Sequence, residues 1–195
     1  RKALERQDDH EDKVRYEFLK MFGYYVTESS SHGSEYVPYY HKRNYPELKE
    51  IYHLPTNGYK NWGNGKAQYW EEVNAMIKDN TLTHVRSREY ASHILEAIET
   101  NKPYEIAGNV LNKGFLISNL PEDACVEVPC LVDANGIQPI RFGALPQQCA
   151  ALNRTNINMQ LLTIEAALTG KREHVYQAAM LDPHTSAELS IGDIV

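Results

Sequence analysis

The densest group of side chains that could do chemistry lies between residues 27 and 40. This segment holds three consecutive serines, two carboxylates, an imidazole and three phenols. Phenol rings can stack on a sugar ring, and carboxylate and imidazole groups can orient its hydroxyls, so the pattern favours a sugar-binding wall. A structural role fits as well, with Ser34 capping a helix and Tyr36 and Tyr39 packing against it. The residues that we single out are Glu28, Ser30, His32, Glu35, Tyr36 and Tyr39.

Asparagines form two further polar groups. Asn109, Asn112 and Asn119 bracket a turn around Gly114, where their amides could bind a hydroxylated ligand or simply shape the turn. Residues 153–158 place Asn, Arg and Thr inside a helical pattern, although Asn and Thr are poor helix formers. We interpret the second group as a buried hydrogen-bonding face that serves either a subunit interface or a ligand.

Patterns for binding nucleotides or metals do not occur in the sequence. The glycines between residues 58 and 65 follow no predicted strand, so they do not form a dinucleotide-binding loop. No His pair has the i, i+4 spacing of a zinc site on a helix. Cys125 and Cys130 are five residues apart in a predicted strand, so their side chains point to opposite faces and disfavour a shared metal. We therefore assign no residue of the chain to a metal or a cofactor.

Composition narrows the class of protein. The chain has 195 residues, of which 42% are hydrophobic and 24% charged, an ordinary balance for a globular domain. Its formal net charge of −6 argues against a dedicated nucleic-acid binder, because phosphate contacts need clustered Lys and Arg. No apolar run approaches the roughly 18 to 20 residues that span a bilayer, so we expect no membrane segment. Three cysteines cannot all pair with one another, which favours a reducing compartment, the cytoplasm.

The elements that position these groups are predicted to be mostly helical. Apolar spacing predicts helices over about 4–22, 66–78, 85–101 and from Pro146 to Gly170, with another over 172–181. Thr83 or Ser87 could cap the third of these. Between the first two helices we expect a short strand at 24–27, a loop at 28–34, a turn or short helix at 35–41 and irregular chain at 44–65.

The middle of the chain is predicted to form a small sheet. Strand candidates lie at 104–107, 115–117 and 126–132, with Pro129 marking an edge or a bulge. Asn135-Gly136 is a strong hairpin signal, with a return strand at 138–142. The fold class is therefore α+β, helix-rich, with a small antiparallel sheet.

Several segments together resemble one family. The longest is FGYYVTESSSHGSEYVPY at residues 22–39, which is similar to the second half of glycoside hydrolase family 4 in its α-galactosidase branch. Later segments fit the same branch: SREYAS at 87–92, GNV and SNLP between 108 and 121, VEVPCLVD at 126–133, AALNRTNIN at 150–158 and AMLDPHT at 179–185.

The resemblance implies the C-terminal portion of a lactate/malate-dehydrogenase-like glycosidase, a substrate and oligomerisation domain over residues 1–195. The NAD-binding Rossmann domain would then be absent from this chain. Such enzymes cleave α-galactosides by a redox route, an exception to the two-carboxylate scheme of most glycosidases. NAD⁺ oxidises the C3 hydroxyl, Mn²⁺ polarises the ketone, a base removes the C2 proton, the glycosidic bond eliminates, and water adds before the hydride returns.

The resemblance also implies roles for residues of this chain. Related branches place the C2 base, a Tyr or Asp, near the start of this portion, so Tyr36, His32 and Glu35 are the catalytic or base-proximal candidates. Glu28, Ser30, Tyr39 and Asn109 are the substrate-binding candidates. The Cys and His metal ligands of the family lie in the missing half, so the chain alone is expected to be inactive.

Two alternatives stay open. The sugar could be another α-linked glucoside or galacturonide; a galacturonide calls for extra cations, and the 27–40 segment is followed by His41-Lys42-Arg43. The chain could also be a non-catalytic oligomerisation module. The resemblance implies a homo-oligomer, a dimer or a tetramer.

Overall fold

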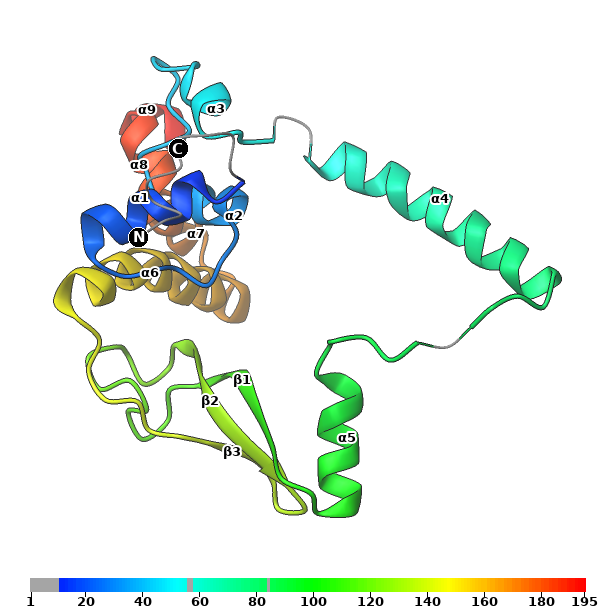
Figure 1. Ribbon diagram of the computed structural model, residues 1–195. Coiled ribbons are helices and arrows are strands. Elements are labelled where there is room, and N and C mark those ends of the chain that lie inside the picture. The colour runs from blue at the N-terminus through cyan, green and yellow to red at the C-terminus, as the bar shows by residue number, and fades with distance from the viewer. Residues whose placement is uncertain (1–10, 56–57, 84) are drawn as a thin grey trace.

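A computed structural model describes residues 11–55, 58–83 and 85–195 (Figure 1). These residues form helices and a three-stranded sheet in a mixed α+β fold, as predicted. The helices are α1 (Lys13–Phe22), α2 (Ser30–Glu35), α3 (Leu48–Ile51), α4 (Gly58–Lys78), α5 (Ala91–Thr100), α6 (Gln147–Thr169), α7 (Arg172–Leu181), α8 (Pro183–Glu188) and α9 (Ile191–Ile194). The strands are β1 (Tyr104–Leu111), β2 (Cys125–Asp133) and β3 (Gly136–Pro139).

The sheet is antiparallel in the order β1-β2-β3, with Gly108 opposite Val128 and Val132 opposite Ile137. Alternate residues of β2 are buried, so one face of the sheet is apolar and the other exposed. Gly108 is required on the buried face, because a Cβ there would lie 2.7 Å from the Cys130 sulfur. Pro129 lies in the central strand, one residue past the last β2–β3 pair, where its carbonyl accepts a hydrogen bond from the Ile140 amide. Its missing N–H therefore costs no ladder bond.

The predicted hairpin forms between β2 and β3. Asp133 pairs with Gly136 across the turn, and Gly136 has a φ of 91°. Asn135 does not have a positive φ, so the glycine takes the left-handed position that closes the turn. The Asp133 carboxylate accepts hydrogen bonds from the Asn135 amide and the Gln138 side chain, which lower its pKa. The return strand begins two residues earlier than predicted, and the candidate at 115–117 forms only one bridge, from Ile117 to Gly143.

Two apolar clusters hold the fold together. The larger joins the buried face of the sheet to α5 and α6, and includes Ala97, Val128, Val132 and Ile157. The smaller joins α1 to the chain that follows α2, and its buried members are Val14, Phe18, Val37, Tyr40 and Leu54. Figure 1 shows α6 lying between the two, above the sheet and below α1. Helix α2 packs against α1, which contributes Val14 and Phe18 to the smaller cluster.

Several helix predictions are confirmed. Gly170, with a φ of 67°, ends α6, and α7 spans the predicted residues 172–181. Of the apolar stripe along α6, Ile157 is buried, whereas Ile164 and Leu168 are 53% and 79% exposed. No helix of the described residues is long and apolar enough to cross a membrane.

Other boundaries differ from prediction. Residues 24–27 bend and form no strand, and α2 starts at Ser30, where a loop was expected. Part of the stretch expected to be irregular is helical, because α4 starts at Gly58. Helix α5 starts at Ala91, six residues later than predicted, with no side-chain cap from Thr83 or Ser87. The first helix is seen from Lys13, and residues 4–10 of that prediction lie outside the described chain.

Candidate functional site

Helix α2 carries the centre of the predicted site. Its cap is Ser29, not Ser34, and the Ser29 hydroxyl accepts a hydrogen bond from the His32 amide (3.3 Å). One face of the helix, formed by Ser30, Gly33 and Ser34, is buried toward α1. The opposite face exposes His32 and Glu35, which form an i, i+3 pair with 3.2 Å between Nδ1 and Oε2. The helix therefore presents an imidazole and a carboxylate side by side to solvent.

The remaining predicted residues of the segment take different positions. Tyr36 and Tyr39 are about half exposed, at 47% and 49%, and the Tyr36 carbonyl accepts a hydrogen bond from the Asn156 side chain of α6 (3.0 Å). Glu28 accepts a hydrogen bond from the Ser29 amide (3.0 Å) at the start of α2. Ser30 is buried, and its hydroxyl has no hydrogen-bond partner. Ser30 therefore does not reach the surface that His32, Glu35 and the two tyrosines share.

A cleft of 510 Å³ opens beside α2, between the chain after Tyr40 and helix α8. Glu35 is the predicted site residue that lines it. His41, Lys42 and Arg43, which the sequence offered only as cations for a galacturonide, line it as well. The sequence assigned no role to the other lining residues: Lys49, His184, Thr185, Glu188 and Leu189. The cleft thus brings together residues that are far apart in the sequence. Arg43 and Glu188, which are 145 positions apart, share a hydrogen bond of 3.1 Å.

Two histidines meet at the wall of the cleft. Their rings, His41 and His184, are edge to face with centroids 6.0 Å apart. His41 Nε2 lies 2.9 Å from the Ser34 hydroxyl, which already donates to the Ser31 carbonyl at 2.6 Å, so His41 is the donor of this pair. Burial lowers the pKa of His41, with His184 adding to the shift. His41 is therefore held neutral with a fixed tautomer, while the buried Nδ1 of His184 has no hydrogen-bond partner.

Charged residues surround the rest of the cleft. The Glu188 carboxylate accepts bonds from the Lys42 ammonium (3.0 Å) and the Arg43 amide (3.1 Å), which lower its pKa. This pair ties α8 to the chain that follows α2. Because the Lys42 ammonium is paired with Glu188, Arg43 and Lys49 are the other two cationic side chains among the described residues that line the cleft.

The asparagines near Gly114 have structural roles, apart from Asn109. Asn112 is fully buried and bonds the backbone at Ile117, Leu120 and Pro121. Asn119 bonds both backbone groups of Leu145. Asn109 is exposed on β1, opposite Glu127, and does not line the cleft. The structure therefore does not bring Asn109 together with α2.

The polar group on α6 is not the buried face that we predicted. Asn153, Arg154 and Thr155 are exposed, and Arg154 bonds Asn158 along the same helix (2.7 Å). Only Asn156 reaches another element, through the Tyr36 carbonyl.

A signal for the missed cleft residues was partly available. His184 and Thr185 lie in the segment 179–185 that carries the family resemblance, and His41 to Arg43 follow the predicted site directly. Lys49 and Glu188 carry no local pattern, and only the fold brings them to the cleft. Among the described residues, no three His, Cys, Asp or Glu side chains converge as a metal ion needs, so these residues do not fit a complete metal site.

Comparison with known proteins identifies the family. Residues 1–185 match the family 4 glycosyl hydrolase C-terminal domain. The chain is 56% identical, over all of its length and 45% of the relative, to an alpha-galactosidase of Bacillus subtilis (strain 168). It is 37% identical, over 91% of the chain and 38% of the relative, to an alpha-galactosidase of Rhizobium meliloti (strain 1021). The chain thus spans less than half the length of these curated relatives.

Solved structures have the same fold. The Bacillus subtilis protein lplD matches 94% of this chain and 42% of its own, with a TM-score of 0.75 and 24% identity. A 6-phospho-alpha-glucosidase from gut microorganisms, in complex with NAD and Mn²⁺, matches 93% of this chain and 41% of its own, with a TM-score of 0.66 and 19% identity. The predicted fold, the C-terminal part of a dehydrogenase-like glycosidase, is confirmed by these matches. The chain belongs to the family 4 glycosyl hydrolases, as their C-terminal domain.

Proposed function

We propose that the protein to which this chain belongs hydrolyses α-galactosides of the melibiose type. The observation that supports this most strongly is the 56% identity to the Bacillus subtilis alpha-galactosidase over the whole chain. Relatives of this family named for glucosides or phosphorylated glucosides are less similar, at 25% to 36% identity over the matched residues.

We propose that the complete protein uses NAD and Mn²⁺, as in the oxidation, elimination, addition and reduction route that the family resemblance implies. A family structure in complex with both groups supports the choice of cofactors. Since the described residues of this chain do not converge as a metal site, we assign both cofactors to the part of the protein outside it. The chain by itself is then expected to be inactive.

The part of this chain in the reaction is to form one wall of the substrate site. His32 and Glu35 are exposed, adjacent and hydrogen-bonded, so a proton can be held or passed between them at the wall surface. Tyr36 and Tyr39 expose ring area on which a sugar can stack, and Tyr36 stays our candidate for the base. Glu28 lies at the start of the same helix as a further hydroxyl ligand. Ser30 and Asn109 were expected to bind substrate, but their positions give them no place on this wall.

Turnover of an aryl α-galactoside tests the proposal. The full-length protein, supplied with NAD⁺, Mn²⁺ and a reductant, should release the aryl group, whereas the 195-residue chain should not. Robust turnover by the isolated chain would contradict the assignment of the cofactors to the missing part. A full-length protein that is folded and inactive on every α-galactoside would contradict the substrate.

A second substrate class, α-galacturonides, has one observation in its favour. The cleft beside α2 places Arg43 and Lys49 where a sugar carboxylate could be bound, and a galacturonide is the sugar that would need them. Comparing kcat/KM of the full-length protein on matched aryl galactoside and galacturonide substrates decides between the two. We expect the galactoside to be preferred.

We further propose that the protein is a cytoplasmic homo-oligomer, a dimer or a tetramer. Three free thiols, at Cys125, Cys130 and Cys149, support a reducing compartment. Exposed apolar side chains on several elements support self-association, among them Trp62, Tyr69 and Trp70 of α4.

A further inference from the structure

Two side chains of helix α6 reach the segment that carries the candidate site. The Gln148 amide donates to the Phe22 carbonyl (3.1 Å), and the Asn156 amide donates to the Tyr36 carbonyl (3.0 Å). Phe22 is the last residue of α1 and Tyr36 is the C-cap of α2, so each amide binds a carbonyl at a helix end, where the helix itself offers no donor. The two amides therefore hold both ends of residues 22–36, which include the whole of α2.

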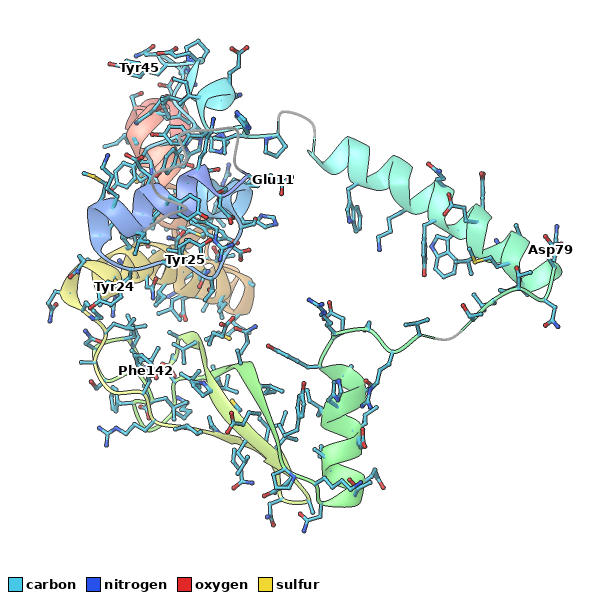
Figure 2. All side chains as sticks on the ribbon, in the orientation of Figure 1. Glu11, Tyr24, Tyr25, Tyr45, Asp79 and Phe142 are labelled. Atoms are coloured by element: carbon cyan, nitrogen blue, oxygen red, sulfur yellow. The ribbon has the colours of Figure 1, made fainter. Side chains whose placement is uncertain are left out.

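Helix α6 is a firm support for these bonds. Gln148, Leu152 and Asn156 follow one another in steps of four, which places them on one side of the helix. Leu152 packs against the smaller apolar cluster, and Ile157 is buried in the larger one, so α6 is packed against both. Figure 2 shows the held segment passing close to α6 at Tyr25 in this view, in agreement with the bond from Gln148.

An asparagine at position 156 needs such a partner. It lies in the interior of a 23-residue helix, where Asn is a poor helix former. Its amide nitrogen also lies 3.5 Å from the Leu152 carbonyl and 3.3 Å from the Thr155 hydroxyl. The contact with the Tyr36 carbonyl, at 3.0 Å, is the shortest of the three and the one that leaves the helix. The Tyr36 carbonyl therefore accounts for the amide at this position.

We propose that Asn156 is a positioning residue for Tyr36, a role that rests on the proposed function, in which Tyr36 is the candidate base. The bond holds the Tyr36 carbonyl and with it the planar peptide that joins Tyr36 to Val37. Val37 is buried in the smaller cluster, so the backbone is held on both sides of this peptide. Helix α2 has only six residues, too few to keep its own end in place. Asn156 thus directs the phenol through the backbone and needs no contact with the substrate.

Steady-state kinetics of the full-length protein on an aryl α-galactoside, with NAD⁺, Mn²⁺ and a reductant, tests this role. Asn156→Leu and Asn156→Asp nearly keep the size of the side chain and remove the amide donor. Each should lower kcat about tenfold and change KM less than about twofold, because a misdirected base slows the chemical step more than it weakens substrate binding. Asn156→Gln keeps an amide donor and should restore kcat to within about threefold of the unmodified protein.

Gln148→Leu is the matched control. It removes the same kind of bond from the same helix, but at Phe22, the far end of the held segment. Its kcat should change less than about twofold, because Tyr36 keeps its own bond to α6. If Gln148→Leu and Asn156→Leu lower kcat equally, α6 supports the segment as a whole, and the specific role of Asn156 is overturned.

Tyr36→Phe shows whether Asn156 acts through the phenol. This change alone should lower kcat, and adding Asn156→Leu to it should cause little further loss, because the second residue acts through a group that is already absent. A further tenfold loss in the double variant, or an unchanged kcat in Tyr36→Phe, would overturn the positioning role. Turnover that is equal in the unmodified protein and in Asn156→Leu would contradict this role alone. A folded full-length protein without turnover would contradict the proposed function, and this role with it.

Discussion

Two polar regions of this molecule look alike in sequence and differ in structure. The turn after β1 holds Asn112, whose side-chain amide makes four hydrogen bonds to backbone groups, all between 2.8 and 3.1 Å. Helix α2 holds His32 and Glu35, whose only described side-chain bond is to each other, at the surface. The hydrogen-bonding groups of Asn112 are used inside the fold, whereas those of His32 and Glu35 lie at the surface, where a ligand can reach them.

The difference separates a residue that shapes the backbone from one that can bind a substrate. Asn112 has no exposed surface, and the carbonyls that it binds belong to a loop with no regular structure. Without that amide the Leu120 carbonyl would lose its described partner, and the Ile117 and Pro121 carbonyls would each keep only one backbone hydrogen bond, which is costly in a buried site. His32 and Glu35 hold no other part of the backbone through their side chains. Mutations should therefore affect stability in the first region and activity in the second.

The largest effect is expected from Asn112→Ala. The change removes the Asn112 bonds of the Leu120 carbonyl and the Ile117 amide and one of the two bonds at each of the Ile117 and Pro121 carbonyls, so we expect a loss of about 3 to 5 kcal/mol of unfolding free energy. Urea unfolding of the 195-residue chain measures it. Asn109→Ala is the matched control, because Asn109 is an exposed asparagine three residues earlier on β1 and should change stability by less than about 0.5 kcal/mol. Equal losses in the two variants would remove the distinction between these asparagines.

A smaller effect, on catalytic activity and not on stability, is expected from Glu35→Gln. In the full-length protein the change removes the carboxylate beside His32, and kcat/KM on an aryl α-galactoside should fall about 100-fold. Stability of the chain should change by less than about 1 kcal/mol, because the pair is exposed. Lys171→Gln, at an exposed position outside the site, serves as the control. If Glu35→Gln loses stability and keeps its activity, then Glu35 supports the fold as Asn112 does and does not act on the substrate.

The sequence predicted the elements whose signals are local. The Gly136 hairpin, the end of α6 at Gly170 and the span of α7 depend on residues within a few positions, and all three are as predicted. Helix α4 was predicted eight residues too short, since its glycines and asparagines read as irregular chain. Local propensity cannot find such a helix when its stability depends on packing against something else.

The candidate site was predicted only in part, for a similar reason. The polar residues of α2 are adjacent in the sequence, so the sequence identified this segment and its exposed pair, His32 and Glu35. The sequence could not show that Ser30 turns inward, because a one-residue step around a helix decides which face is buried. Nor could it show that His184 and Glu188, from the other end of the chain, complete the cleft.

The smallest of the expected effects concerns His41, which both forms a hydrogen bond inside the fold and lines the cleft. Its ring lines the cleft, yet its Nε2 is committed to Ser34, and burial lowers its pKa below the ordinary value of about 6.5. His184 and Lys49 add to this shift, and Glu35 opposes it.

Above about pH 6.5 the imidazole is neutral in both the folded and the unfolded chain, so it adds no pH dependence there. As the pH falls below that value, the unfolded chain takes up the proton more readily, and stability declines until the folded pKa has been passed. Urea unfolding at a series of pH values should therefore show a shallower decline for His41→Gln than for the unmodified chain. If the variant keeps the original slope, the neutral state of His41 does not stabilise the fold, and its place in the cleft is a matter of ligand binding alone.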